Sequence, residues 1–499
     1  MYNVEQNGKF MSGELINMDQ LIFTNEDKCV GCNQCIRFCP IFEANTAYVT
    51  EDGNKVKVNM DKCIHCGKCI DVCNHGARDY IDDIESFIND LKEGKNISIL
   101  AAPSIRVNFK NYKKLFGYLK SLGCNIFYDV SVGADITTWA YIKYLKESKK
   151  KSIISQPCPA IVNYIEKVRP DMIEDLIPIH SPLLCAAIYN KDYEKVRDDF
   201  AFLSPCIAKK DEIDAKETNG FVKYNVTFKK LKQYFERNHI DLDSFDEENF
   251  KEDNTIGFLY SRPGGLSENI ELIDKDMWVR QIEGQEKVYG YLNTYKKRLE
   301  SNESVPGVID ALNCEFGCNV GTAIGSEKVD VDYADNKYNS IKNKKKTKEI
   351  KKIQRTYDKK LKLNDFKRKY SSIETCRIKE PTDEEKKEIF ISLNKETYRD
   401  KTMNCSACGY KTCEEMVVAM FNNLNVKENC MDYSKKYISI EKNILDEKNQ
   451  KMNIALKQIE ELGKEKEIRS RELKNSVEEI SISVEEIAKG SVENVAEIN

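Results

Sequence analysis

Eight cysteines between residues 29 and 73 constrain the fold of this chain more than any other feature. They form two copies of one spacing, C-x₂-C-x₂-C-x₃-C, in "CVGCNQCIRFC" and "CIHCGKCIDVC". In such runs three thiolates of a tight loop face one [4Fe–4S] cluster, and the fourth cysteine ligates the other cluster. We therefore assign cluster A to Cys29, Cys32, Cys35 and Cys73, and cluster B to Cys63, Cys66, Cys69 and Cys39.

The doubled run resembles the bacterial two-cluster ferredoxin module, which we expect over residues 20–82. CxxC pairs also bind zinc, and two zinc sites are the alternative. Asn74 replaces a proline that often follows the second copy, but that proline is not a ligand. We interpret His65 and His75, which lie beside ligands, as surface residues.

Size and composition narrow the class of protein. The 499 residues suffice for two to four domains, and the formal net charge of −4 argues against nucleic-acid binding by the whole chain. We find no apolar run long enough to span a bilayer and no signal-peptide pattern, so we expect a cytoplasmic protein with reduced thiols. Metal ligation is then the leading explanation for 19 cysteines.

Apolar strands alternate with amphipathic helices between residues 96 and 325. Predicted strands lie in residues 96–104, 125–130, 150–155, 199–204, 255–260 and 307–312. This alternation predicts an α/β domain with a largely parallel sheet.

Three further cysteines, Cys158, Cys206 and Cys314, follow the ends of predicted strands. Ligands in open α/β sheets bind beyond the carboxyl ends of the strands, so the three loops are expected to converge. Cys318 adds a fourth sulfur, which completes the ligands of one more [4Fe–4S] cluster. The alternative is that each is a packed core thiol.

These loops resemble the three signature loops of the [FeFe]-hydrogenase catalytic domain, approximately TSCCP, PCxxKxxE and a loop with two cysteines four apart. They read "SQPCP", "PCIAKKDE" and "CEFGCNVG" in this chain. The segments "APSIRV", "VGADIT", "HSPLL" and "YSRPGGLSE" match other family segments in order. The resemblance covers roughly residues 20–330, and we expect the H-cluster domain over residues 95–328.

The resemblance implies an H-cluster, in which a [4Fe–4S] cube shares a thiolate with a diiron unit that carries CO, cyanide and a bridging dithiolate. By position, Cys158, Cys206, Cys314 and Cys318 hold the cube, and Cys318 bridges to the diiron unit. Lys209 corresponds to the lysine that donates a hydrogen bond to a cyanide. Pro103, Ser104 and Ser204 are implied to bind the cofactor.

Several positions depart from the family pattern. Pro157 replaces the first cysteine of TSCCP, which relays protons, and residues 139–141 lack the expected glutamate. The other departures are Ser204 and Leu312 in place of methionines and Leu183 and Leu184 in place of glutamines. General acid–base catalysis needs a positioned proton carrier, so we do not expect fast hydrogen turnover.

A second cysteine-rich segment follows residues 329–380, which we interpret as a basic linker or surface helix. Residues 381–432 resemble a small four-cysteine [4Fe–4S] domain of redox and sensory proteins, with zinc as the alternative. Thr412 and Glu415 form a predicted capping box before an apolar helix. The expected ligands are Cys405, Cys408, Cys413 and Cys430, which brings the total to four clusters; Cys124, Cys185 and Cys376 are interpreted as structural or incidental.

Residues 433–499 have a heptad pattern of apolar residues, exemplified by Ile438, Leu445, Met452 and Ile459. This pattern predicts a coiled coil and hence a homodimer. The last 25 or so residues resemble the opening of the signalling domain of methyl-accepting chemotaxis proteins, so the coiled coil is interpreted as leading to a signalling output whose nature the sequence leaves open.

Three functions fit these observations. The first is a sensory hydrogenase-like protein that binds hydrogen or reports redox state and signals through the coiled coil to an unknown partner. The second is a slow hydrogenase linked to ferredoxin, and the third is an iron–sulfur electron-transfer protein without the diiron unit. The sequence leaves open whether hydrogen is turned over or only sensed.

Overall fold

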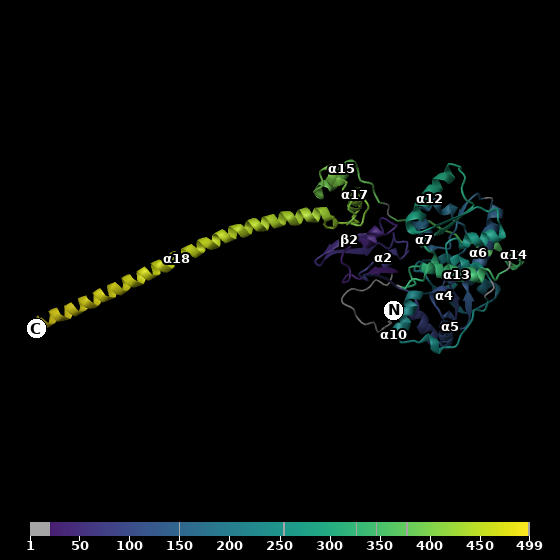
Figure 1. Cartoon of the computed structure of the whole chain (residues 1–499), viewed down its shortest axis with the longest axis horizontal. Helices are drawn as coiled ribbons and strands as arrows, with labels where there is room; N and C mark the ends of the chain where they lie inside the picture. Colours follow the sequence, from purple (N-terminus) through teal and green to yellow (C-terminus); the bar gives the residue numbers. More distant parts are fainter. Residues whose placement is uncertain are drawn as a thin grey trace, which may run out of the picture. The chain divides into compact units, whose positions relative to one another are not determined.

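The computed structural model describes residues 20–148, 150–252, 255–325, 327–345, 347–375 and 378–497. The chain forms two compact units (Figure 1). The first comprises Met1–Ser392 and Glu396–Asn429, and the second comprises Leu393–Lys395 and Cys430–Asn499.

The N-terminal part of the first unit consists of two small antiparallel sheets and two short helices. β1 (Ile22–Thr24) pairs with β4 (Arg78–Tyr80), and β2 (Asn45–Thr50) pairs with β3 (Gly53–Val58). Each CxxCxxC loop leads into a single helical turn, α1 (Gln34–Arg37) or α2 (Lys68–Asp71). The backbone enters these turns through left-handed residues, Asn33 and Gly67, which allows the tight loops.

A four-stranded parallel sheet forms the larger core. Its strand order is β6 (Phe127–Asp129), β5 (Ile97–Ala101), β8 (Asp199–Ser204) and β9 (Val222–Thr227). Every residue of β5 is buried, as expected of a strand covered on both faces. The helices that pack into this core include α3 (Ile84–Lys92), α5 (Tyr112–Ser121), α8 (Pro182–Ile188) and α10 (Phe228–Arg237).

A separate three-stranded parallel sheet has the order β10 (Val279–Glu283), β11 (Val308–Leu312) and β7 (Ile153–Ile154). The domain is therefore built on two parallel sheets rather than the single sheet expected from the strand pattern. Helices α7 (Pro159–Lys167) and α12 (Gln285–Glu300) pack into the core that contains β11.

The strand predicted at residues 255–260 is wrong, because most of this segment is the 3₁₀ helix η5 (Gly257–Ser261). It packs on α6 (Val130–Ser148) so closely that a Cβ at Gly257 would overlap the Ser131 carbonyl oxygen. A short apolar run does not distinguish a buried strand from a buried helical turn.

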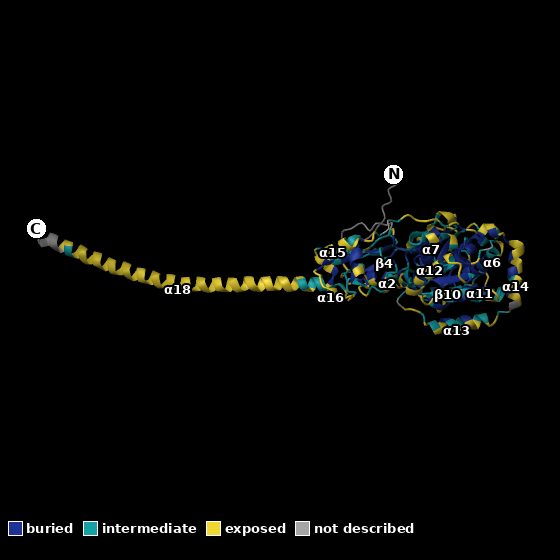
Figure 2. Ribbon diagram, turned by 90° about the horizontal axis from the view of Figure 1, so that it is seen from above, coloured by how far each residue is buried: buried dark blue, intermediate teal, exposed yellow. Residues whose placement is uncertain are grey.

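Residues 329–380, expected to be a linker, form part of the shell of the hydrogenase-like domain. They contain α13 (Val331–Lys342), α14 (Thr347–Lys360) and η7 (Leu363–Phe366). The side chains of Tyr338 and Phe366 are fully buried, and the Tyr338 hydroxyl donates to the Pro103 carbonyl at 3.2 Å. The sequence did not predict this packing, because basic residues predominate and only one narrow face of each helix is buried (Figure 2).

The other helices of the first unit are α4 (Ile105–Asn108), α9 (Lys209–Asp214), α11 (Gly265–Ile273), α15 (Asp383–Ser392), α16 (Tyr398–Lys401) and α17 (Cys413–Phe421). The second unit is dominated by one continuous helix, α18 (Met431–Glu497). Its predicted seam residues are exposed, for example Ile459 and Ile487 (Figure 2). Their pairing in a coiled coil stays a prediction. Across the described residues, every helix is too short or too polar to cross a membrane.

Candidate metal centre

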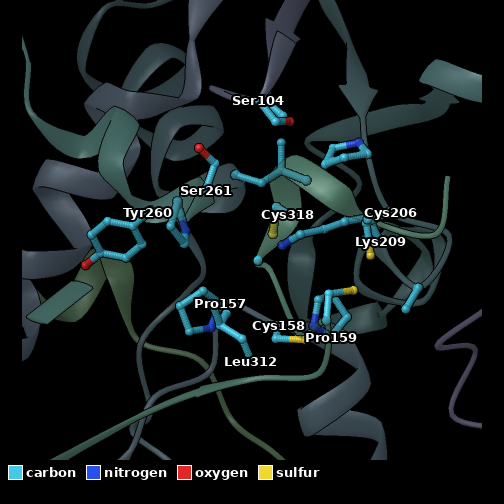
Figure 3. A pocket seen from close by; sticks show the side chains of 18 of the residues that line it. Ser104, Pro157, Cys158, Pro159, Cys206, Lys209, Tyr260, Ser261, Leu312 and Cys318 are labelled. Atoms are coloured by element: carbon cyan, nitrogen blue, oxygen red, sulfur yellow. The ribbon is translucent and has the colours of Figure 1, made fainter. Parts of the chain in front are cut away.

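Loops at the carboxyl ends of both parallel sheets surround one cavity of about 90 Å³ (Figure 3). Cys158 follows β7 and precedes α7, Cys206 lies between β8 and α9, and Cys314 follows β11. Cys318 begins the 3₁₀ helix η6 (Cys318–Val320). All four cysteines line the cavity, although they are separated by up to 160 positions in the sequence. They meet beyond the carboxyl ends of the strands, as the sequence predicts.

The four thiols influence one another electrostatically. Burial, together with the neighbouring Cys158 and Cys318 thiols, raises the pKa of Cys314 to about 12. Burial, together with the Cys206 and Cys158 thiols, likewise raises the pKa of Cys318 to about 12. Four thiolates in so apolar a cavity are unfavourable unless a cationic group compensates their charge.

The residues present fit an iron–sulfur cluster. Among the described residues, no group of Cys, His, Asp or Glu side chains converges closely enough to hold a single metal ion. The four thiols instead surround a space, which is the arrangement that a multi-atom cluster needs. The cavity also contains the Ser104 hydroxyl, which is fully buried and has no hydrogen-bond partner among the described residues. Such a group is available to a polar ligand of a bound cofactor.

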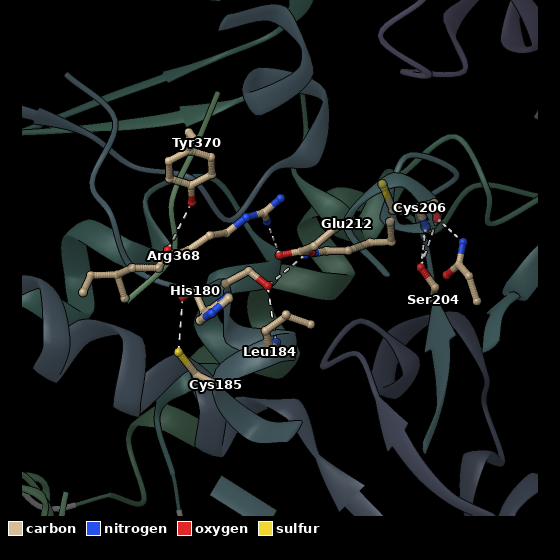
Figure 4. A network of polar contacts seen from close by, with 12 residues as sticks. His180, Leu184, Cys185, Ser204, Cys206, Glu212, Arg368 and Tyr370 are labelled. Atoms are coloured by element: carbon tan, nitrogen blue, oxygen red, sulfur yellow. Dashed lines mark hydrogen bonds and ion pairs between the residues drawn. The ribbon is translucent and has the colours of Figure 1, made fainter. Parts of the chain in front are cut away.

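Lys209 extends into this cavity (Figure 3), and its charge offsets part of the rise in pKa that burial causes in Cys206 and Cys318. Its Nζ forms an ion pair with the Glu212 carboxylate and donates to Ser181 Oγ at 3.3 Å. Arg368 Nη1 lies 3.4 Å from the other Glu212 oxygen (Figure 4). Burial alone would raise the pKa of Glu212, but the charges of Lys209 and Arg368 outweigh it and lower that pKa.

Sequence reasoning missed Arg368, because it lies in the segment interpreted as a linker. The Arg368 backbone N–H donates to the Pro178 carbonyl at 3.1 Å, and the Tyr370 hydroxyl donates to the Ile179 carbonyl at 3.2 Å. The His180 N–H in turn donates to the Phe366 carbonyl at 2.8 Å. These bonds hold the segment across the loop before α8 and place the guanidinium beside Glu212.

The structure separates the three residues expected to bind the cofactor. Pro103 and Ser104 line the cavity. Ser204 is not among the lining residues; its hydroxyl accepts from the Cys206 N–H at 3.0 Å and donates to the Cys206 carbonyl at 3.1 Å. Ser204 therefore shapes the loop that presents Cys206, because its hydroxyl is already engaged within that loop.

Three of the departures from the family pattern fall on the cavity wall. Pro157, Leu183 and Leu312 all line it. Tyr141, in the region of the expected glutamate, is fully buried, and its hydroxyl accepts from the Gln156 N–H at 3.3 Å. The side chains of Pro157, Leu183 and Leu312 are thus apolar. Burial raises the pKa of the Tyr141 hydroxyl well above its ordinary value.

Several of the N-terminal cysteines influence one another across the two motifs. Burial raises the pKa of Cys66, and the thiol that contributes most to the rise is Cys39 from the first motif rather than a member of its own loop. Burial also raises the pKa of Cys35, with smaller contributions from Cys29 and Cys32. This proximity of Cys39 to the second loop matches the crossed pattern of ligands, and the assignment itself stays a prediction. Cys73 accepts from the Ala77 N–H at 3.3 Å.

Arg78 is a second residue that sequence reasoning missed. It is 4% exposed, and its Nη2 lies 3.3 Å from Cys35 Sγ and 2.9 Å from Asn45 Oδ1. Its charge offsets part of the rise in pKa that burial causes in Cys35 and Cys69, which belong to different predicted clusters. No spacing rule in the sequence marks an arginine five residues after the last cysteine of the motif.

The second cysteine loop lies directly against the cavity. Cys66 is one of the cavity-lining residues, and its carbonyl accepts from Thr322 Oγ1 at 3.0 Å. A Cβ at Gly67 would lie 2.5 Å from the same Thr322 oxygen, so glycine permits this approach. The surface interpretation of His65 is wrong: the residue is buried, and its Nδ1 lies 2.8 Å from Asp211 in α9. His75 is exposed, as expected.

The C-terminal cysteines are divided between the two units. Cys405, Cys408 and Cys413 belong to the first unit, whereas Cys430 is the first residue after its end. Thr412 caps α17 as predicted, accepting from the Glu415 N–H at 3.0 Å, but the Glu415 carboxylate accepts from the Lys411 N–H instead of closing the box. The four-cysteine site stays a prediction.

Two further cysteines, Cys124 and Cys185, are not among the residues that line the cavity. Both are buried, and the Cys185 thiol donates to the His180 carbonyl at 3.2 Å. Cys376 lies outside the described residues.

Comparisons with known proteins agree with this arrangement. Residues 95–322 match the family "Iron only hydrogenase large subunit, C-terminal domain", and residues 21–74 match "4Fe-4S dicluster domain". The periplasmic [Fe] hydrogenase large subunit of Nitratidesulfovibrio vulgaris is 30% identical over 225 residues, which are 39% of this chain and 52% of that protein. The chain thus spans about half the length of this curated relative.

Solved structures of [FeFe]-hydrogenases are also similar. One, from work on oxygen inactivation of the H cluster 2Fe subcluster, has 16% identity and a TM-score of 0.45. A variant [FeFe]-hydrogenase from Chlamydomonas reinhardtii has 14% identity and a TM-score of 0.42. Each comparison covers 59% of this chain and 99% of the other.

The domains and the cysteine groups define an iron–sulfur protein of mixed α/β type. More particularly, residues 95–322 match the C-terminal domain of the iron-only hydrogenase large subunit, and residues 21–74, which precede them, match a 4Fe-4S dicluster domain.

Proposed function

We propose that this protein is a hydrogen or redox sensor whose cavity holds an H-cluster that turns hydrogen over slowly or not at all. The cube would be held by Cys158, Cys206, Cys314 and Cys318, with Cys318 shared with the diiron unit. Lys209 would donate a hydrogen bond to an anionic diatomic ligand, because its ammonium extends into an apolar cavity. When bound, the diiron unit supplies the reversible conversion of hydrogen into two protons and two electrons.

One observation carries the sensory part of the proposal. The ligand cysteines and Lys209 are retained, whereas the wall position next to Cys158 is Pro157, which cannot carry a proton. Leu183 and Leu312 make the same wall apolar. A site that keeps its ligands but lacks its proton carrier favours binding over turnover.

The rest of the chain supplies routes in and out. Three further clusters would transfer electrons between the cavity and a redox partner such as ferredoxin. They are clusters A and B and a C-terminal cluster held by Cys405, Cys408, Cys413 and Cys430. The exposed apolar seam of α18 would pair with the same helix of a second copy, because burial of such a stripe requires a partner. The paired helix would transmit the state of the cavity to a downstream partner.

Replacing Pro157 by cysteine tests the proposal by restoring a proton carrier. We expect slow hydrogen evolution by the wild-type protein after maturation with the diiron unit, and a rise of about tenfold in Pro157→Cys. This is less than the 10²–10⁴-fold that a complete relay contributes, because other relay positions are also changed. The measurement is hydrogen evolution from a chemical reductant, by gas chromatography.

Pro159→Cys is the matched control, because Pro159 lines the cavity on the other side of Cys158. We expect no gain in that variant. Hydrogen evolution by the wild-type protein at the rate of typical enzymes would contradict the sensory role. An absence of bound diiron unit would leave an electron-transfer protein.

A further inference from the structure

Two cysteine loops that are far apart in the sequence touch each other in the first unit. Asn33, between Cys32 and Cys35, donates from Nδ2 to the Ala407 carbonyl at 3.2 Å. Ala407 lies between Cys405 and Cys408. The contact therefore joins the ligand loop of predicted cluster A to the ligand loop of the predicted C-terminal cluster.

The two loops also pack closely. Gly409 has a φ of +96°, and a Cβ at this position would lie 2.7 Å from the Ile36 Cβ and 3.2 Å from the Asn33 carbonyl oxygen. Only glycine fits both the left-handed backbone and the short distance. Beside it, the rings of Tyr410 and Phe42 lie 4.8 Å apart between centroids. Since Asn33 is 5% exposed, the contact is shielded from solvent.

The contact extends along the rest of the C-terminal segment. The Ala47 N–H of β2 donates to the Leu424 carbonyl at 2.9 Å. Asn54 Nδ2 of β3 donates to Asn429 Oδ1 at 2.7 Å. Asn429 immediately precedes Cys430 in the sequence. The segment is thus fixed to the dicluster domain from its first cysteine loop to the residue before its last cysteine.

The other ligand loop of the dicluster domain also makes a close contact. There Cys66 of cluster B lines the hydrogenase cavity, and Thr322 binds its carbonyl. Ligand loops are therefore adjacent at each step from the C-terminal segment to the cavity.

We infer that the four predicted clusters form one linear electron path, in the order C-terminal cluster, cluster A, cluster B and cavity cube. The Asn33–Ala407 and Ile36–Gly409 contacts form the junction at its outer end. In each step one electron leaves a reduced cluster and reduces its neighbour, so no other reactant is required. The outer cluster would be the site that reports the state of the cavity, because its last ligand immediately precedes α18. This inference rests on the part of the proposed function that assigns a cluster to the C-terminal cysteines.

The junction can be tested by electron paramagnetic resonance of the reduced, cluster-loaded full chain. Neighbouring paramagnetic clusters broaden and split each other's signals. We expect such an interaction to disappear in Cys405→Ala, which removes the outer cluster, and to weaken strongly in Gly409→Ala, whose Cβ separates the loops. Asn33→Gly is a milder variant that keeps the left-handed backbone and removes only the bond to Ala407; there we expect partial weakening.

Gly53→Ala is the matched control, since Gly53 has a φ of +106° and a Cβ there would have no neighbour within 4 Å. This substitution introduces the same kind of backbone strain without a clash. We expect the magnetic interaction between the clusters to be the same as in the wild type. If the wild-type protein has its full iron content but its outer cluster is magnetically isolated, the electron path is overturned and the proposed function is not. Zinc released from the C-terminal cysteines would overturn both the outer cluster and the path, whatever the cavity holds.

Discussion

Replacing Cys206 by alanine is expected to remove one cluster's worth of iron, about four atoms per chain. Cys206 is one of four thiols that line the cavity, and the pKa of its own thiol is raised by burial and then by the Cys158 and Cys314 thiols. A cube that loses one of its thiolates in this apolar space loses both a ligand and part of the charge balance. Iron analysis and electron paramagnetic resonance of the anaerobically purified variant measure the loss.

Cys185→Ala is the matched control, because Cys185 is also fully buried but its thiol donates to a backbone carbonyl. We expect a loss of about 1–2 kcal/mol in the free energy of unfolding and no loss of iron. Wild-type iron content in Cys206→Ala would contradict a cluster in the cavity.

Replacing Glu212 by glutamine is expected to lower the free energy of unfolding by about 3–5 kcal/mol at pH 7. Glu212 is 3% exposed and is the counter-charge of both Lys209 and Arg368, so the substitution leaves two buried cations uncompensated. The folded-state pKa of Glu212 lies below its ordinary, unfolded-state value. The stability that the Glu212 carboxylate contributes is therefore fully present above the unfolded-state pKa and is lost as pH falls through the folded-state pKa. Urea denaturation at pH 7 and pH 5 should therefore give nearly the same difference between variant and wild type.

Glu414→Gln supplies the comparison, because Glu414 pairs with Lys386 at 2.8 Å on the surface. We expect a change of about 0.5 kcal/mol or less. Equal effects of the two substitutions would show that the Lys209–Glu212–Arg368 network is not a buried electrostatic core.

The gathering of the cavity cysteines was predictable because a simple rule links local sequence to position. Each of Cys158, Cys206 and Cys314 follows a short, continuous apolar run, and parallel strands present such positions at one edge. The rule does not depend on how many sheets there are. It therefore placed these residues correctly although the domain contains two sheets instead of one.

Other features depend on contacts that the sequence does not encode locally. Arg368 lies in a strongly basic stretch, where nothing distinguishes the one guanidinium that meets Glu212 from its solvated neighbours. His65 looked like a surface residue because its partner, Asp211, is 146 residues away. The apolar run at residues 255–260 predicts a strand, whereas most of it forms a short helix, because so short a run has no periodicity that distinguishes the two. Ser204 matched a cofactor position in the family, but its hydroxyl bonds within its own loop.

We propose that the cavity between the two sheets holds an H-cluster with both the cube and the diiron unit. Infrared spectroscopy of the full chain after maturation with the diiron unit is the decisive measurement, because CO and cyanide bound to iron absorb where proteins do not. We expect CO and cyanide bands in the wild-type protein, shifted in Lys209→Met and absent in Cys318→Ala. A fully iron-loaded wild-type protein without these bands would contradict it.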